Sequence, residues 1–432
     1  MNVTKNQIVI IGGIGIVVLL FALMFAGVIP GLRPGPEVVA NADLIIWGLD
    51  SKKSIDPAIA AFSAKYKGLT IEYREFTDEA EYNATLLDSL AAGTGPDVFV
   101  VRNTGVLEHA NKIAPLSAQN LPILSFRRLF PQVVERDFVM NNSIYALPTS
   151  VDTLALIYNK DTMNQAAIIT PPGTWDEFLA LVPKLTTVDS ARRIERAGAA
   201  IGGSTQNIDT AADVLSLLML QNSVPMVDAN LRSANFSTPG GSEALSFYTQ
   251  FANTGSNAYT WNAGLPRALD LMSQGRLAML FGYSSALSEL RARNPLLNLD
   301  VAPMPQRAGT TQPVTYASYW GYTVARQSTN QDLAWNFILT LTTENTPASA
   351  YAIETRRVPA LLSLLNTYLT DPTLNVFARQ ALIARSWPQV SPLAITGIFS
   401  DMIDLVNENR ASATEAVKLG EGRVSQLMSK RP

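Results

Sequence analysis

Cysteine is absent from this chain of 432 residues, and histidine occurs once, as His109. Without thiols the chain has no disulfide, no thiolate metal site, no cysteine nucleophile and no lipid attachment through an N-terminal cysteine. The segment Gly282–Ala286 imitates the turn that carries a nucleophilic serine, but such a serine needs a histidine downstream. His109 lies far upstream, and we interpret it as a residue of a surface helix.

Metal and phosphate motifs are also missing. The sequence contains no HExxH or EF-hand spacing, and its short glycine clusters at 12–15 and 93–95 lack a phosphate-loop lysine and the full dinucleotide fingerprint. A carboxylate pair acting as in a glycosidase stays open, because 16% charged residues offer many chance pairs. We therefore expect no enzymatic activity, metal or cofactor.

Positive charge is not in excess. The formal net charge is −3, and no dense cluster of lysine and arginine overrides that average. A nucleic-acid partner is therefore not expected, because it requires a basic surface. With 47% hydrophobic residues, a chain of this length buries a large core and should form two domains or two lobes.

One long apolar run is present, from Ile8 to Ile29, and no charge interrupts it. As a helix it would extend roughly 33 Å, enough to cross a bilayer. We predict an uncleaved, single-pass membrane anchor that leaves the C-terminal part outside the cytoplasm. The alternatives are a cleaved secretory signal, with its nearest small-residue site at Ala40-Asn41-Ala42, and a buried core helix.

Strand and helix patterns alternate after the anchor. Residues 30–42 are rich in proline and glycine and predict a semi-rigid linker, so the folded part should start near Asp43. The order strand, helix, strand, helix, strand follows over residues 44–47, 56–67, 69–76, 79–92 and 97–101. This alternation predicts a parallel sheet with helices on its faces.

Two long extended segments, 145–159 and 315–325, interrupt a mostly helical remainder. Pro148 suits a crossing between lobes better than a central strand. Further strands are expected at 275–281 and 300–304. Helical patterns cover residues 175–185, 210–221, 241–253, 265–274, 331–340, 348–353, 375–385 and 393 to the C-terminus.

Five phrases along the chain resemble motifs of one family. They are TGPDVFVVRN (94–103), LPTSVDTLALIYNKD with PPGTWDEFLAL (147–161 and 171–181), GRLAMLFGYSSAL (275–287), DVAPMPQ (300–306) and YASYWGYTVARQSTNQDLAWNFILTL (316–341). Each phrase is weak alone, but together and in this order they are similar to the family 1 extracellular solute-binding proteins of ABC importers. That group includes maltose-binding protein.

The resemblance implies an α/β architecture of two lobes, the type II periplasmic-binding-protein-like fold, with a mainly parallel sheet and flanking helices in each lobe. We place lobe 1 at residues 43–149 and about 320–372, and lobe 2 at about 150–319 and 373–432. The resemblance implies capture of a small ligand, with a carbohydrate favoured, and its delivery to an ABC permease. No cofactor is implied.

Many relatives carry a lipid-modified cysteine, so residues 8–29 would serve here as the tether to the membrane. The alternative function is a tethered sensor or scaffold that uses the same binding fold. An anchored hydrolase is the third possibility.

Candidate ligand-binding residues follow from the implied fold, in which crossing segments and the carboxyl ends of strands line the cleft. Aromatic rings stack on the C–H faces of sugars, and polar side chains bond their hydroxyls. The aromatic candidates are Trp47, Tyr283, Tyr319, Trp320 and Trp387. The polar candidates are Asp50, Asn103, Thr149, Asp152, Ser284, Ser318 and Arg357.

Asp152 is the leading candidate, because an acidic residue in an otherwise apolar extended segment has no evident structural task. Arg356 and Arg357 precede VPAL, a stretch where the family often has a loop near the cleft, and they favour an anionic ligand if they face it. The alternatives are core packing for each aromatic ring and a solvated surface position for the two arginines.

Overall fold

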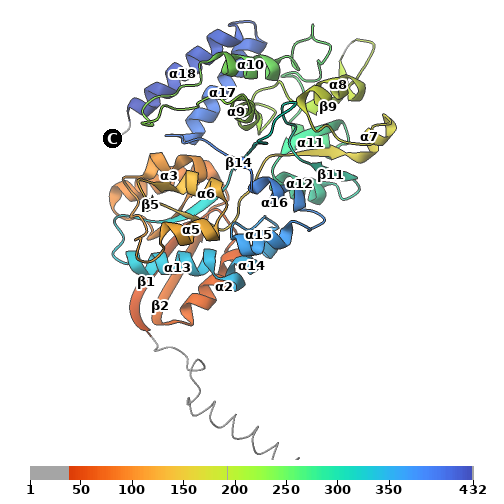
Figure 1. Ribbon diagram of the computed structural model, residues 1–432. Coiled ribbons are helices and arrows are strands. Elements are labelled where there is room, and N and C mark those ends of the chain that lie inside the picture. Colours follow the sequence, from red (N-terminus) through yellow and green to blue (C-terminus); the bar gives the residue numbers. More distant parts are fainter. Residues whose placement is uncertain (1–37, 192, 431–432) are drawn as a thin grey trace, which may run out of the picture.

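The computed structural model describes residues 38–191 and 193–430. Its strands form two five-stranded sheets, in the orders β2-β1-β3-β13-β6 and β11-β7-β10-β9-β8. Helices surround each sheet, and Figure 1 shows the two resulting lobes one above the other. We call the lobe around the first sheet lobe 1 and the lobe around the second sheet lobe 2.

Lobe 1 contains most of the N-terminal third of the described chain and a later return segment. Its strands are β1 (Val38–Gly48), β2 (Tyr66–Glu75), β3 (Val98–Arg102), β6 (Leu147–Pro148) and β13 (Trp320–Val324), with a hairpin of β4 (Val139–Met140) and β5 (Ser143–Ile144). Its helices are α2 (Lys52–Ser63), α3 (Glu79–Ala92), the 3-10 turn η1 (Asn103–Gly105), α4 (Val106–His109), α5 (Ile123–Leu129), α6 (Gln132–Phe138), α13 (Gln331–Thr343), α14 (Asn345–Thr355) and α15 (Leu362–Tyr368).

Lobe 2 contains the middle of the chain and its C-terminal helices. Its strands are β7 (Ala155–Asn159), β8 (Thr187–Val188), β9 (Ile194–Ala200), β10 (Leu277–Gly282) and β11 (Leu299–Ala302). Its helices are α7 (Lys160–Gln165), α8 (Trp175–Leu185), α9 (Ala211–Gln221), α10 (Pro239–Thr249), α11 (Ala268–Ser273), α12 (Ser284–Arg293), α16 (Asn375–Ala381), α17 (Pro392–Asn407) and α18 (Ala413–Ser429).

The sheets are mixed, so the expectation of a mainly parallel sheet in each lobe is wrong for lobe 2. There β10 pairs parallel only with β9, and β7 runs antiparallel to both β10 and β11. In lobe 1, β13 is antiparallel to β3. The reason is the route of the chain: β7 and β13 start at a crossing between lobes and run away from it, whereas β3 and β10 run toward it.

Several boundaries differ from the sequence prediction because strand partners were unknown. Strand β1 begins at Val38, inside the segment 30–42 that the sequence predicts as a linker, and Val38 pairs with Tyr66. Helix α2 runs over Lys52–Ser63, so Tyr66 lies in β2 and not in the predicted helix. Helix α8 matches its predicted bounds, and Thr174 with Glu177 forms a complete capping box at its start.

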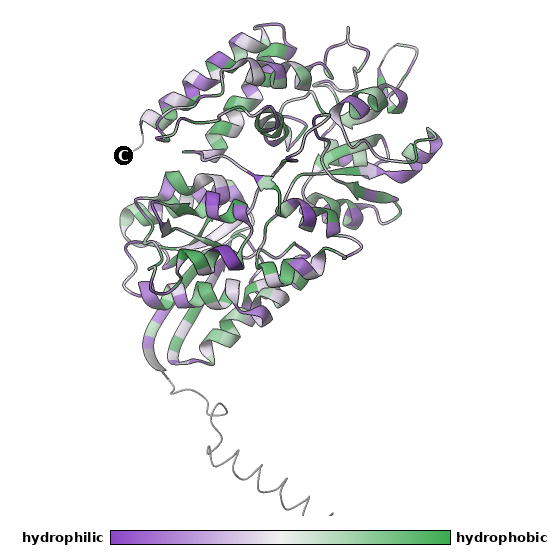
Figure 2. Cartoon of the chain, viewed as in Figure 1, coloured by the Kyte–Doolittle hydropathy of each residue, from purple (hydrophilic) through white to green (hydrophobic). Residues whose placement is uncertain are grey.

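The apolar core follows the buried strands and the inner faces of the helices, which Figure 2 shows in green while the outer helix faces carry more purple. All residues of β10 are buried. His109 is a correction: its side chain is only 13% exposed, and its ring meets Phe99 edge-on at 6.1 Å. Helix α4 therefore packs this histidine against β3 and does not present it to solvent.

Three extended segments join the lobes and lie side by side. Residues 149–154 follow β6, residues 315–319 precede β13, and residues 384–389 include β14 (Ala384–Arg385). Strand β12 (Thr315–Tyr316) pairs parallel with β14. The backbone N–H of Leu154 donates to the carbonyl of Tyr316 at 2.9 Å, which links the first segment to the second.

The predicted anchor at residues 8–29 lies outside the described residues. Within 38–191 and 193–430, none of the helices combines the length and the apolar character that crossing a membrane requires.

Gly321 in lobe 1 and Gly397 in lobe 2 provide a paired test of the described packing. A Cβ at Gly321 in β13 would lie 2.5 Å from Cζ of Phe138, whereas one at Gly397 in α17 would meet nothing within 4 Å. We expect Gly321→Ala to lower the free energy of unfolding by about 1–3 kcal/mol. Gly397→Ala should raise it by about 0.5–1 kcal/mol, because alanine favours a helix interior. Urea denaturation measures both, and equal effects would contradict the described packing.

Candidate functional site

A cavity of about 310 Å³ lies between the two lobes, and both lobes line it. Lobe 1 contributes the start of α3, the end of β3 and Thr104, and lobe 2 contributes the starts of α9 and α17. The crossing segments 315–319 and 384–389 complete the lining. We call it chamber A. Its lining residues are Asp78, Glu79, Ala80, Arg102, Thr104, Asp209, Ala212, Asp213, Tyr316, Ser318, Gln389, Pro392, Leu393 and Thr396.

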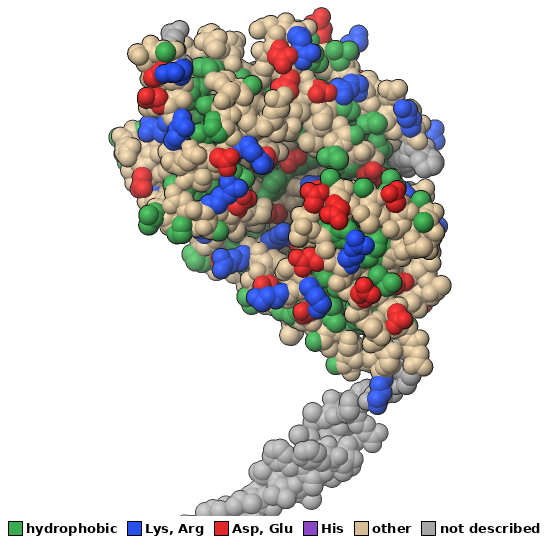
Figure 3. Space-filling model, turned by 180° about the vertical axis from the view of Figure 1, so that it is seen from behind, with side chains coloured by type: hydrophobic (Ala, Val, Ile, Leu, Met, Phe, Trp, Pro, Cys, Tyr) green, Lys and Arg blue, Asp and Glu red, His purple; other side chains and the backbone are tan. Residues whose placement is uncertain are grey.

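A second cavity, chamber B, of about 540 Å³ shares Thr104 with chamber A. Lobe 1 supplies residues of η1, α6 and the β4–β5 hairpin, and lobe 2 supplies the loop Ala229–Leu231. The hairpin turn residues Asn141 and Asn142 both have positive φ, 49° and 60°, as a tight two-residue turn requires. Figure 3 shows that the molecule is hollowed between the lobes and that side chains of both charges surround the hollow.

Arg102 is the central cation of chamber A. It is the last residue of β3, so the parallel strand delivers it to the cleft edge of the sheet. Its guanidinium lies 5.0 Å from the ring centroid of Trp320, donates to Ser318 Oγ at 2.9 Å and pairs with Glu79. The half-buried Trp320 is held edge-on against Tyr82. Two predicted residues, Ser318 and Trp320, are thus brought together around an arginine that the sequence analysis did not select.

The lobe 2 wall of chamber A is acidic. Asp213 lies in the first turn of α9, where the helix dipole favours a negative charge, and accepts a hydrogen bond from the Tyr283 hydroxyl at 2.7 Å. Burial raises the pKa of Asp213, and the nearby Glu79 raises it further, whereas Tyr283 and Arg102 lower it. The predicted residue Tyr283 therefore acts on the cavity through Asp213.

Asp137 ties lobe 1 to two of the crossing segments at chamber B. It accepts hydrogen bonds from Asn103 Nδ2 at 2.9 Å, from the Tyr319 hydroxyl at 2.6 Å and from the Ser386 hydroxyl. Burial nevertheless raises its pKa to about 6. Asn103 and Tyr319, both predicted as ligand residues, are fully engaged in this network, since Asn103 Oδ1 also accepts from the backbone of Tyr319.

A second polar group lies beside the crossing segments, outside the two chambers. The Asp50 carboxylate accepts hydrogen bonds from Arg357 Nη1 at 2.7 Å and from the Tyr351 hydroxyl at 2.9 Å. The Arg357 side chain is 33% exposed, so it is not a freely solvated surface arginine, whereas Arg356 is exposed. Thr149 is buried in the same region. This arrangement pairs Arg357 with a carboxylate of its own chain.

Asp152 has a structural task, contrary to the premise of its selection. Its Oδ1 accepts from the backbone N–H of Ser284 at 3.0 Å and of Thr153 at 2.9 Å, and its Oδ2 accepts from Ser284 Oγ at 2.7 Å. Asp152 therefore ties the first crossing segment to the start of α12. Its role in ligand binding stays a prediction.

Two predicted tryptophans are buried in the lobes. Trp47 is 7% exposed, contacts Phe76 and lies under Arg74. Trp387 is 2% exposed, packs between Phe236 and Phe399, and donates to Ser216. In this conformation neither ring borders chamber A or B, so neither can stack on a ligand there.

Sequence reasoning missed the charged residues of the cleft, Glu79, Arg102, Asp137 and Asp213. A signal existed for two of them. Arg102 stands at the carboxyl end of a predicted strand, beside the selected Asn103, and Asp213 follows Asp209 by four residues at the start of a predicted helix. No local pattern singles out Asp137, whose partners come from three distant segments.

The raised pKa of Asp137 predicts a pH dependence of stability. Because the folded value of about 6 exceeds the ordinary value of 3.8, the folded protein binds the proton more tightly than the unfolded chain. The stabilisation is complete below pH 3.8 and is lost as the pH rises through 6. Relative to Asp137→Asn, the unmodified protein should lose on the order of 3 kcal/mol across this range. Denaturant unfolding at several pH values measures it, and a pH-independent difference would contradict the assignment.

Comparison with known proteins adds the family. The profile of the bacterial extracellular solute-binding proteins matches residues 48–345. Among solved structures, a solute-binding protein from Thermotoga lettingae, bound to α-D-tagatose, has a TM-score of 0.71 at 22% identity, covering 89% of this chain and 99% of that one. The cyclic α-maltosyl-1,6-maltose binding protein from Arthrobacter globiformis has a TM-score of 0.75 at 18% identity, covering 90% and 99%.

A sugar-binding protein from Xanthomonas citri is similar as well, with a TM-score of 0.74 at 18% identity over 90% of this chain and 98% of that one. Identities this low establish the fold alone. The family match covers more than half of the chain and agrees with the two lobes and the cavity between them. The chain therefore belongs to the bacterial extracellular solute-binding protein family.

Proposed function

We propose that this chain is a membrane-tethered extracellular solute-binding protein that captures a carbohydrate between its lobes and delivers it to an ABC permease. The observation that carries the proposal is chamber A, in which both lobes present polar groups to one enclosed space. The half-buried ring of Trp320 lies behind Arg102 and supports its guanidinium at that space. The three structural neighbours named above are sugar-binding by their descriptions.

The polar groups of the cavity suit hydroxyl-rich ligands. Carboxylates accept hydrogen bonds from hydroxyls, and a guanidinium donates to them, while the ring of Tyr316 in the lining supports the apolar side of a sugar. Chamber B shares Thr104 with chamber A and carries the amides of Asn141 and Asn230. The two spaces together favour an oligosaccharide over a single sugar unit.

Capture follows from contacts that only the approach of the lobes completes. Glu79 and Arg102 belong to lobe 1, and Asp213 belongs to lobe 2, so a ligand that bonds all three draws the lobes together. The energy that shifts the open and closed populations is the ligand's differential affinity for the closed form. The paired crossing segments supply the hinge, and the closed form would dock on the permease.

Ligand identity can be tested by thermal shift of the whole chain in detergent. A panel of sugars, polyols, amino acids and peptides is screened at a concentration near 100 times the dissociation constant, where binding stabilises the folded state by about 2.7 kcal/mol. We expect oligosaccharides to raise the melting temperature and peptides to leave it unchanged. The absence of a shift with every sugar would refute a carbohydrate-binding function.

Trp320→Ala should weaken sugar binding by roughly tenfold, because the variant loses the ring that supports the Arg102 guanidinium. Asp152→Ala should also weaken it, through the link to α12. Titration calorimetry measures both. Leu124→Ala, on a side chain that is 69% exposed in α5, is the control and should bind normally. Unchanged affinity in both Trp320→Ala and Asp152→Ala would place the binding site elsewhere.

The tether is tested separately. The full chain should sediment with membranes and resist extraction by high salt, because residues 8–29 form an uncleaved apolar helix under the proposal. A chain that starts at residue 38 should stay in the supernatant. A mature N-terminus near Asp43 in the cellular protein would instead support a cleaved signal.

A further inference from the structure

The charge of chamber A is unbalanced. Four carboxylates line it, those of Asp78, Glu79, Asp209 and Asp213, and Arg102 is the one cation among the described lining residues. Two of the carboxylates are paired within the protein. Glu79 forms an ion pair with Arg102. Asp209 accepts two hydrogen bonds, at 2.8 and 2.9 Å, from Nη2 of Arg267, which lies outside the cavity. Asp78 and Asp213 have no cationic partner within the described part of the chain.

Asp213 is the more enclosed of these two. Its Oδ2 accepts from the Tyr283 hydroxyl at 2.7 Å, and within residues 38–191 and 193–430 its Oδ1 accepts no hydrogen bond. Asp78 is exposed at the start of α3, where one carboxylate oxygen accepts from the backbone N–H of Glu81 at 2.7 Å. A free acceptor on Asp213 therefore faces the cavity from lobe 2, opposite an acidic helix start in lobe 1.

These charges oppose each other across the cleft. Glu79 and Asp213 come from different lobes, line the same cavity, and sense each other strongly enough for Glu79 to raise the pKa of Asp213. Arg102 lowers the pKa of Asp213 more than Glu79 raises it. It is nevertheless one cation among four lining carboxylates, and its guanidinium is already engaged by Glu79, Ser318 and the ring of Trp320. Closure around a neutral ligand brings the acidic groups closer, and a ligand carboxylate or phosphate adds to the repulsion.

We propose that chamber A selects a sugar in which a protonated amine replaces a hydroxyl, with the ammonium group held between Asp213 of lobe 2 and Asp78 and Glu79 of lobe 1. This inference rests on the proposed function, because it names the ligand class of the same cleft. The ammonium group donates to the free Oδ1 of Asp213 and neutralises the excess negative charge as the lobes approach. Neutral sugar units occupy chamber B, where amide side chains predominate over charge.

The test compares amino sugars with neutral sugars of the same shape. Glucosamine, galactosamine and the glucosamine disaccharide are titrated against glucose, galactose and cellobiose by calorimetry, at near-neutral pH where the amines are largely protonated and the carboxylates stay ionised. A charge-assisted hydrogen bond predicts roughly tenfold or greater preference for the amino form. The preference should shrink at high salt, because the charges of the cleft are partly screened. Sugar acids should bind more weakly than the neutral sugars, and spermidine should show whether an amine alone suffices.

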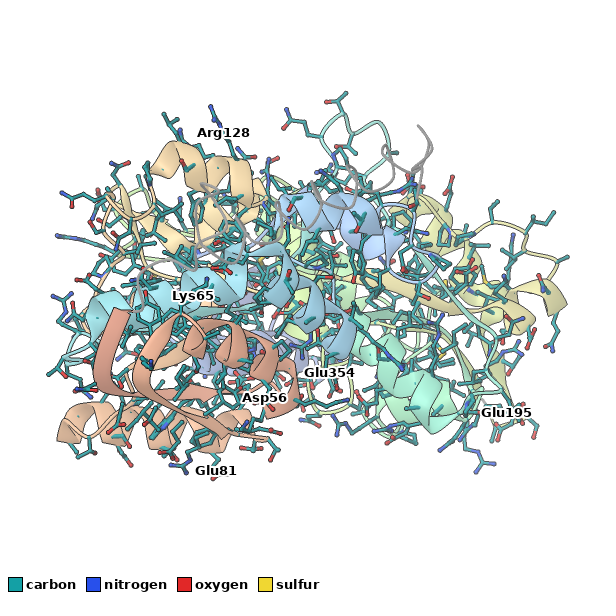
Figure 4. All side chains as sticks on the ribbon, turned by 90° about the horizontal axis from the view of Figure 1, so that it is seen from below. Asp56, Lys65, Glu81, Arg128, Glu195 and Glu354 are labelled. Atoms are coloured by element: carbon teal, nitrogen blue, oxygen red, sulfur yellow. The ribbon has the colours of Figure 1, made fainter. Side chains whose placement is uncertain are left out.

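Asp213→Asn retains an acceptor for Tyr283 and removes the charge, so it should abolish the preference for the amine while neutral sugars still bind. Glu81→Gln is the matched control. Glu81 lies in the first turn of α3, as Glu79 does, but it does not line the cavity. Glu195→Gln removes one from the periphery of lobe 2. Figure 4 shows both residues at the outer edges of the molecule. Both controls should keep the preference.

The outcomes separate the two levels of the proposal. Neutral sugars that bind as tightly as their amino counterparts would overturn the amine subsite and leave a carbohydrate-binding function intact. An equal loss of preference in Asp213→Asn and Glu81→Gln would also overturn it, since the effect would then reflect net charge alone. Binding of spermidine alone would move the ligand class from amino sugars to other amines. No binding of any sugar would refute the proposed function together with this inference.

Discussion

The connection between the lobes depends on backbone hydrogen bonds that the crossing segments make with one another. Ser318 N–H donates to Asp152 O, Ala317 N–H donates to Arg385 O, and Leu154 N–H donates to Tyr316 O. Buried backbone N–H and C=O groups must form hydrogen bonds. Segments between the two sheets have no sheet neighbour to bond with, so they need other hydrogen-bond partners. The crossing segments satisfy each other, which sets the spacing of the lobes and leaves an enclosed space on the side of chambers A and B.

Charged side chains beside this connection reinforce it at two points. Asp152 bonds the start of α12 in lobe 2, and Asp50 at the end of β1 in lobe 1 bonds Arg357. Arg357 also lowers the pKa of Asp152, which burial raises. Buried charges of this kind are costly to leave unpaired, so they favour one arrangement of the surrounding segments. Asp152 and Asp50, both selected as ligand contacts, thus lie in the support of the segments that join the lobes.

The fold class was predictable because it rests on local patterns. Strand β3 and helices α3 and α8 appear where apolar periodicity and capping residues place them, and Pro148 marks the exit from the lobe 1 sheet. The direction of β7 was not predictable, since it depends on which lobe the chain has just left. Nor was the early start of β1, because Val38 is a strand residue only through its pairing with Tyr66.

The site shows the same division at the level of single residues. The motifs at 94–103 and 316–341 contain residues that line the chambers, and the motif at 147–161 contains the first crossing segment. A crossing and the carboxyl end of a strand leave marks in the local sequence. Which side chains face the cavity depends on contacts between distant segments. Trp387 and Trp320 look alike in sequence, yet Phe236 and Phe399 bury one while Arg102 and Tyr82 hold the other half-buried beside chamber A. Burial, and with it access to a ligand, was decided only by tertiary contacts within each lobe.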